Sequence, residues 1–198
     1  MSRSTTRRSV HPTDEELIAS ILDGRPELFA ELVGRYQGRL VSYLHRMLRN
    51  EEDAHDLAQE VFVKIYGALD RFDPKYRFST WLFRVAQNAA IDLIRKRRLK
   101  LVSIHRDDAD GDGGDWELPG DDPTPYQDVR NMERGTAIRR AIDALPWEYK
   151  ELITLRHYAE LSYDEIATMK EMPLGTVKNK LFRGRQMLKE QLSDFLTD

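Results

Sequence analysis

Residues 162–189, SYDEIATMKEMPLGTVKNKLFRGRQMLK, form the stretch of sequence that is most informative about the fold. Ser162 can cap a helix over 162–170, and Pro173 interrupts the chain before a second helix over 174–195. Two helices separated by so short a break are typical of a helix-turn-helix. The stretch therefore predicts a small helical domain at this end of the chain.

The second helix of this stretch has a strongly basic side. Between residues 174 and 189 there are five basic side chains and no acidic one. Val177 and Leu181 belong to an apolar stripe, whereas Phe182 lies about 100° further round the helix and points among the cations. Basic charge alone is equally typical of a solvated helix surface. An exposed aromatic ring between cations, directly after a short turn, favours recognition of bases in a DNA major groove.

The charge of the whole chain conceals this pattern. The 198 residues have a net charge of -3, but residues 1–98 carry 17 basic and 14 acidic side chains, residues 99–131 carry 3 and 9, and residues 132–198 carry 11 and 11. The acidic middle segment is rich in Asp, Gly and Pro, which disfavour helices and strands. We therefore expect an all-α protein with two small helical domains, 13–98 and 132–198, joined by a flexible acidic linker and preceded by a disordered tail over 1–12.

Composition also restricts the class of protein. Cysteine is absent, so the chain has no disulfide, thiolate zinc site or cysteine nucleophile. No stretch approaches the ~18 consecutive apolar residues of a membrane-spanning helix, so we expect a cytoplasmic protein without direct membrane insertion.

A carboxylate-bridged metal enzyme is the one enzymatic alternative. Glu52 and His55 form half of the di-iron pattern, in which Glu precedes His by three residues. None of the other four histidines has Glu at that position. We therefore expect no metal, no cofactor and no catalytic residue, and hence no enzyme.

The first domain is predicted to contain four helices, because its apolar residues recur at intervals of three and four. Thr13 and Glu16 form a capping box for the first helix, and the second follows closely. Asn50 can cap the third helix. The fourth is predicted over 80–98, with Ser79 as its cap.

The fourth helix and the loop before it offer a second candidate surface. The polar residues of this helix fall at helical spacing on one stripe, namely Arg84, Asn88, Asp92 and Arg95. Over residues 71–81, aromatic side chains are interleaved with basic ones. Aromatic rings among cations suit unpaired bases, which stack on the rings while the backbone is neutralised. For Phe78 and Trp81 considered alone, closure of the helical core is the stronger interpretation.

The third helix has an acidic, hydrogen-bonding side opposite its apolar stripe. Its members are Asp53, Asp56, Gln59, Glu60 and Lys64. Such a surface suits a basic partner helix, although most charge runs of this kind are only solvated.

Three segments of this sequence, in this order, resemble one known family. They are DLAQEVF at 56–62, FSTWLFRVAQNAAIDLIRKRR at 78–98 and PLGTVKNKLFRGR at 173–185. The chain is similar to the group IV, or extracytoplasmic-function (ECF), sigma factors of bacterial RNA polymerase over about 14–98 and 132–195. The resemblance implies a region 2 domain, which binds core polymerase and the minus 10 promoter element, and a region 4 helix-turn-helix domain, which binds the minus 35 element. It implies that the protein directs the initiation of transcription.

The same resemblance assigns roles to individual residues. For binding the coiled coil of the polymerase beta-prime subunit it implies Asp53, Asp56, Gln59 and Glu60. For the minus 10 element it implies Phe72, Arg77, Phe78, Ser79, Thr80, Trp81, Arg84, Asn88, Asp92 and Arg95. For the minus 35 element it implies Thr176, Lys178, Asn179, Lys180, Phe182, Arg183 and Arg185, with Lys180 and Arg185 better placed for phosphates. Lys178 stands where the family often has Arg, and its ammonium lacks the fork for bidentate contact with guanine.

The partners implied are core RNA polymerase, through its beta-prime and beta subunits, and promoter DNA. An anti-sigma factor is a common further partner in the family and would hold the protein at the inner membrane. The alternative is a helix-turn-helix regulator that does not act as a sigma factor. That alternative accounts for 132–195 but leaves the acidic helix and the aromatic loop of the first domain without a role.

Overall fold

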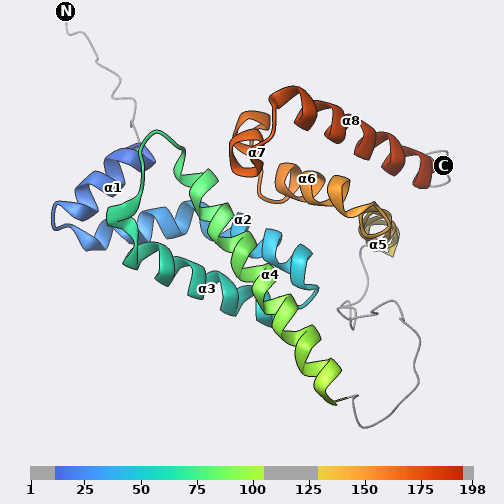
Figure 1. The fold of residues 1–198 in the computed structure, drawn as a ribbon, viewed down its shortest axis with the longest axis horizontal. Coiled ribbons are helices and arrows are strands. Elements are labelled where there is room, and N and C mark those ends of the chain that lie inside the picture. Colours follow the sequence, from blue (N-terminus) through green and yellow to red (C-terminus); the bar gives the residue numbers. More distant parts are fainter. Residues whose placement is uncertain (1–11, 105–128, 194–198) are drawn as a thin grey trace, which may run out of the picture.

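The computed structural model describes residues 12–104 and 129–193, and all regular structure within these two ranges is helical. The all-α prediction is therefore confirmed. The first group of elements contains α1 (Asp14–Leu22), η1 (Pro26–Leu28), α2 (Phe29–Leu48), α3 (Glu51–Gly67), η2 (Leu69–Arg71) and α4 (Phe78–Ile104). The second group contains α5 (Val129–Asp143), α6 (Trp147–His157), α7 (Tyr163–Lys170) and α8 (Leu174–Gln191). Figure 1 shows the second group beside α4 and α2 of the first.

The helices reach further into the predicted linker than its composition suggested. The end of α4 and the start of α5 both lie within 99–131. Residues 99–104, LKLVSI, contain no Gly or Pro, so nothing in them stops the preceding helix. Residues 1–11 of the predicted tail, which was expected to end at residue 12, and residues 105–128 of the predicted linker lie outside the described residues.

Three of the four predicted helix caps are confirmed. Thr13 and Ser162 each form a capping box with the Glu three residues later, and the side chain of Asn50 accepts a hydrogen bond from the backbone of α3. Ser79 was wrongly predicted as a cap, because α4 begins one residue earlier, at Phe78. The Ser79 hydroxyl instead donates to the carboxylate of Glu165 in α7.

The first group is built around α2. Leu40, Tyr43 and Leu44 of this helix are completely buried, and α3 and α4 cover it with their apolar stripes. Burial of each leucine side chain stabilises the fold by roughly 1.5–3 kcal/mol. The polar sides of α3 and α4 are thereby turned away from the core.

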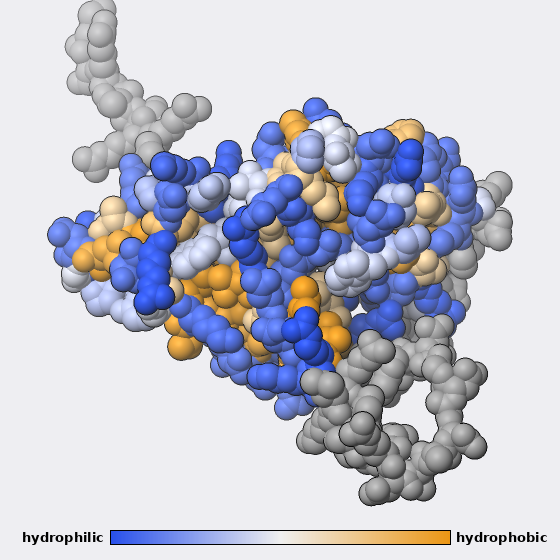
Figure 2. Space-filling model, viewed as in Figure 1, coloured by the Kyte–Doolittle hydropathy of each residue, from blue (hydrophilic) through white to orange (hydrophobic). Residues whose placement is uncertain are grey.

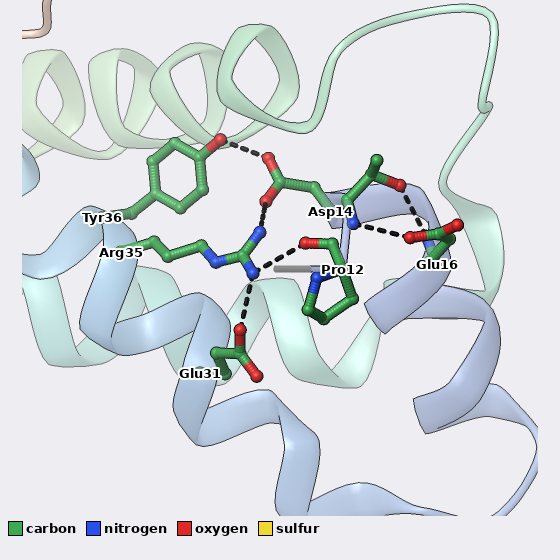
Figure 3. A network of polar contacts seen from close by, with 7 residues as sticks. Pro12, Asp14, Glu16, Glu31, Arg35 and Tyr36 are labelled. Atoms are coloured by element: carbon green, nitrogen blue, oxygen red, sulfur yellow. Dashed lines mark hydrogen bonds and ion pairs between the residues drawn. The ribbon is translucent and has the colours of Figure 1, made fainter. Parts of the chain in front are cut away.

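Two side chains of α2 hold α1 in place (Figure 3). The guanidinium of Arg35 donates to the carboxylate of Asp14 at 2.9 Å and to the carbonyl of Pro12 at 2.7 Å. The Tyr36 hydroxyl donates to the other oxygen of Asp14. Burial and the hydrogen bond to Asp14 raise the pKa of Tyr36, so its hydroxyl stays a proton donor. The Asp14 carboxylate at the start of α1 thus accepts one hydrogen bond from a charged guanidinium and one from a neutral hydroxyl.

The second group has the arrangement of a helix-turn-helix. The turn after α7 places Glu171 in the left-handed region, at φ 52°, and its N–H group and the next one bond the last carbonyls of α7. Val177 and Leu181 of α8 are completely buried, and α8 packs on α6 and α7. The opposite side of α8 is therefore presented to solvent.

Candidate nucleic-acid interface

The outer side of α8 carries the predicted DNA-reading residues. Phe182 has 61% of its surface exposed, which confirms that its ring points away from the buried stripe. The exposed polar members of the same surface are Thr176, Lys178, Asn179, Arg183 and Arg185. A rigid helix with an exposed ring among cations and amides fits the width of a DNA major groove.

Two basic residues of α8 are partly engaged within their own domain. The Lys180 ammonium donates to Glu148 of α6 at 2.6 Å. The guanidinium of Arg185 lies 5.9 Å from the centre of the Tyr163 ring, in a cation–π arrangement. These contacts hold both cations at the edge of the α8 surface, beside its centre at Phe182 and Arg183.

Gly184 is a residue of this helix that the sequence analysis did not single out. A Cβ at this position would lie 3.2 Å from Ile153 Cγ1 and 3.3 Å from Tyr149 Cβ, both in α6. The absent side chain therefore allows α8 to approach α6 closely. A glycine inside an otherwise regular helical pattern was the available signal, because it lowers helix propensity and needs a packing reason.

We expect Gly184→Val to destabilise the second domain by ~1–3 kcal/mol, because the added methyl groups overpack the contact between α8 and α6. Thermal or urea unfolding of the whole chain measures this change. Gly175→Val is the matched control, since it makes the same substitution in the same helix where a Cβ meets nothing within 4 Å. Equal losses for the two variants would contradict the close-packing role.

The loop before α4 is closed by packed aromatic rings. Phe78 is completely buried, and its ring lies 5.3 Å from that of Tyr36 and 6.1 Å from that of Phe72. Phe72 also contacts Trp81, which is half-buried, with ring centres 5.5 Å apart. Although Phe78 was predicted to bind DNA, it offers no surface to a base in this conformation. Arg77 in the same loop is exposed.

The polar stripe of α4 is divided into two parts. Asn88, Asp92 and Arg95 are exposed, and the last two form an i,i+3 ion pair at 3.7 Å. Toward the start of the helix, Ser79 and Thr80 are buried, and Arg84 donates to backbone carbonyls of α7. The structure therefore leaves Asn88, Asp92 and Arg95 of the predicted stripe open, whereas the start of the helix is covered.

The acidic side of α3 forms a shallow hollow on the molecular surface. Its lining consists of Asp56, Gln59, Glu60, Val63 and Lys64. Val63 is 72% exposed, which the sequence analysis overlooked, although an apolar residue off the buried stripe was a visible signal. Figure 2 shows apolar surface over the side of the molecule that α1 and α3 occupy. An apolar residue between carboxylates suits a partner helix that has both apolar and basic side chains.

Asp53 differs from the rest of this surface in its contacts. Both of its carboxylate oxygens accept hydrogen bonds from Arg97 of α4, one of them at 2.5 Å. The hydrogen bond that Arg97 donates to Asp53 raises the pKa of Arg97. Burial of the guanidinium opposes this change, and the negative charge of Asp53 adds to it. Asp53 therefore joins α3 to α4 rather than facing outward with Asp56.

We expect Asp53→Ala to lower the free energy of unfolding by ~0.5–1 kcal/mol, the range of a partly exposed ion pair with good geometry. A double-mutant cycle with Arg97→Ala in urea unfolding measures the coupling. Asp56→Ala is the control, because Asp56 lies exposed on the same helix. Zero coupling between Asp53 and Arg97 would contradict the pairing.

The described residues contain no group of three or more His, Cys, Asp or Glu side chains arranged to hold a metal ion. His55 faces Glu51 at 3.9 Å, on the exposed side of α3. In the same part of the chain, no helix has the length and apolar character needed to cross a membrane.

Two family models match the chain. Residues 32–100 match Sigma-70 region 2, and residues 135–188 match Sigma-70, region 4. The ECF RNA polymerase sigma factor SigW of Bacillus subtilis is 35% identical over 182 residues, which cover 89% of this chain and 95% of that protein. The RNA polymerase sigma-H factor of Pseudomonas aeruginosa is 32% identical, over 93% of this chain and 96% of that protein.

Two solved structures share the fold. CnrH, solved in complex with the cytosolic domain of CnrY, superposes with a TM-score of 0.67 at 23% identity and covers 92% of this chain and 99% of that one. The sigma factor RpoE of Bartonella quintana, solved with the anti-sigma factor NepR, has a TM-score of 0.66 at 22% identity and covers 83% of this chain and 96% of that one.

Proposed function

Because the chain belongs to the ECF sigma factors of bacterial RNA polymerase, we propose that three of its surfaces have different roles in promoter recognition. These surfaces are the hollow of α3, α4 with the loop before it, and the outer side of α8. As a sigma factor, the protein directs core polymerase to promoters and initiates DNA-templated transcription. The hollow of α3 binds polymerase, α4 and its loop bind the minus 10 element, and α8 binds the minus 35 element. The observation that carries this assignment is the exposure of Phe182 among cations on the second helix of the helix-turn-helix.

The hollow of α3 is proposed to bind the coiled coil of the beta-prime subunit. Asp56 and Glu60 provide the charge, Gln59 a hydrogen-bonding amide and Val63 an apolar contact. Asp53 contributes indirectly, by joining α3 to α4. Charge complementarity of this kind speeds association and fixes the register of the two partners.

The loop before α4 and the exposed half of that helix are proposed to capture the minus 10 element as single strand. Phe72 and Trp81 keep part of their ring surface accessible, and Arg77 adds a cation beside them. A base taken out of the stack is held by such rings, while Asn88 and Arg95 are available for base edges and backbone. Melting in this scheme is driven by capture of bases, with no covalent chemistry and no cofactor.

The outer side of α8 is proposed to enter the major groove at the minus 35 element. Phe182 and Arg183 lie at its centre, with Lys178 one turn before them. Thr176, Asn179, Lys180 and Arg185 surround this centre and suit phosphate contacts. Phosphate contacts fix the orientation of the helix, and the central residues read the bases.

Polymerase is required to bring the two DNA elements within reach of one chain. Two turns of duplex span ~70 Å at ~34 Å per turn. The 24 residues between α4 and α5 would span only ~27 Å as a flexible chain and at most ~80 Å when extended. We therefore propose that core polymerase holds this segment extended.

We also propose that the protein acts in the cytoplasm. An anti-sigma factor, as is common in the family, is the further partner that we propose.

Transcription with purified core polymerase on a genomic DNA library tests the proposal. Promoter-specific start sites that depend on this protein are the expected result, together with recovery of the beta-prime subunit in a pull-down. A helix-turn-helix regulator would bind duplex DNA without polymerase and would give neither result. Absence of both start sites and beta-prime would contradict the assignment.

A further inference from the structure

Three cationic side chains meet at a single carboxylate oxygen beside the end of α2. The Oδ1 atom of Asp143 lies 2.7 Å from Arg46 Nη2 and 2.9 Å from Arg49 Nη2. The same oxygen lies 2.6 Å from Lys150 Nζ. The two arginines come from the end of α2, the lysine from α6 and the aspartate from the last residue of α5. One negative charge therefore faces three positive charges.

The carboxylate compensates only one of these positive charges. Burial raises the pKa of Asp143, but the hydrogen bond from Lys150 and the charges of the three cations outweigh burial and hold the pKa below its ordinary value. Asp143 is therefore ionised at neutral pH. In the described part of the chain, none of the three cations forms an ion pair with any other carboxylate. The cluster is left with an excess of two positive charges.

Other ion pairs of the described residues show no such excess of cations. Arg97 has the carboxylate of Asp53 to itself. Lys180 likewise has that of Glu148, and Arg35 lies between two carboxylates. The imbalance at the end of α2 is therefore a particular property of this cluster and not a general feature of the surface.

Arg46 has an unused hydrogen-bond donor within this cluster. Its side chain is 6% exposed, and its Nη2 atom also donates to the carbonyl of Arg139 at 2.8 Å. The Nε atom of the same guanidinium is buried and has no hydrogen-bond partner among the described residues. Because a buried N–H group of a charged side chain is costly to leave unpaired, this donor indicates an acceptor from outside the chain.

The cluster is open to solvent at one end. The side chain of Arg49 is 37% exposed, whereas those of Arg46 and Lys150 are largely buried. A small anion can therefore reach Arg49 first and then contact the more deeply placed groups. Partial enclosure strengthens the attraction, because the dielectric constant there is lower than in bulk water.

From this cluster we propose that Arg46, Arg49 and Lys150 bind a phosphate dianion, supplied either as free phosphate or as the phosphoryl group of a small metabolite. Guanidinium groups present paired N–H donors whose spacing matches the oxygens of phosphate. A phosphate monoester carries a charge of about -1.5 to -2 at neutral pH, which matches the excess charge of the cluster. Chloride or a single carboxylate would leave part of that excess uncompensated. None of the three residues belongs to the surfaces assigned to polymerase or DNA, so the inference is independent of those roles.

A titration followed by NMR tests the site at the atom that lacks a partner. The Arg46 Nε–Hε signal of the ¹⁵N-labelled full chain is identified by its absence from the spectrum of Arg46→Lys. Inorganic phosphate, just above neutral pH, is expected to shift this signal with saturation, while sodium chloride at matched ionic strength leaves it unchanged. A missing or non-saturable shift, or an equal response to chloride, overturns the inference. Adenosine monophosphate distinguishes the two sources, because tighter binding than that of free phosphate identifies a metabolite and weaker binding identifies free phosphate.

Single substitutions test the contribution of each cation. Arg49→Gln and Lys150→Gln are each expected to weaken the binding of inorganic phosphate about tenfold in isothermal titration calorimetry, because each removes a charged donor. Lys150→Arg keeps the charge and should retain most of the affinity. The matched controls Arg97→Gln and Lys189→Gln remove one arginine and one lysine outside the cluster. Unchanged affinity in the first pair, or equal losses in the controls, overturns the assignment of the site.

Discussion

Replacing Asp56 and Glu60 with lysine is expected to weaken binding to core RNA polymerase by ~2–5 kcal/mol, which is ~30-fold to several thousand-fold. Both side chains are exposed in the hollow of α3, so the substitutions place cations against a basic partner without disturbing the core. An equilibrium titration of the labelled protein with core polymerase measures the loss. Circular dichroism of the free variant shows whether the helical fold is retained.

A second pair of charge reversals provides the control for this prediction. Glu27→Lys and Glu52→Lys change the net charge by the same amount at exposed sites of the first domain, outside the hollow. These variants should bind polymerase nearly as well as the parent chain. Equal weakening by both pairs would mean that net charge, and not the hollow, determines binding.

Phe182→Ala and Arg183→Ala are expected to reduce recognition of the minus 35 element by ~1–3 kcal/mol each, and more when combined. Each removes a side chain that is exposed on the outer side of α8. The measurement compares transcription from a promoter with that from the same promoter whose minus 35 element has been replaced. Binding of core polymerase should remain unchanged, because we propose that it depends on the hollow of α3.

Two exposed residues elsewhere in the second domain serve as controls for α8. Trp147→Ala removes an exposed aromatic ring from α6, and Arg140→Ala removes an exposed guanidinium from α5. Neither should alter the dependence on the minus 35 element. The proposed reading surface would be wrong if these variants matched the α8 variants, or if the α8 variants lost polymerase binding to the same extent.

Local features of the fold were predictable because they depend on residues close in the sequence. The capping boxes at Thr13 and Ser162 join residues three positions apart, and the orientation of Phe182 follows from helix geometry alone. The surface around Phe182 could therefore be predicted from the order of residues within a single helix.

Contacts between distant segments could not be predicted in this way. Ser79 has the residue type of a helix cap, but its hydroxyl binds Glu165 from the other domain. Asp53 follows the spacing of the acidic side of α3, yet Arg97 of α4 donates hydrogen bonds to both of its carboxylate oxygens. Periodicity assigns a residue to one side of its own helix and gives no information about which other helix lies there.

The anchoring of α1 on α2 has a practical consequence for dividing the chain into fragments. The match to Sigma-70 region 2 begins at residue 32, after α1 has ended. A fragment cut at that boundary would keep Arg35 and Tyr36 but lose Asp14, their shared acceptor, and would uncover the apolar surface that Leu17 and its neighbours occupy. Such a fragment is expected to aggregate on expression and to be cut early by proteases near the start of α2. A fragment that begins before Thr13 should yield a stable domain for crystallisation or NMR.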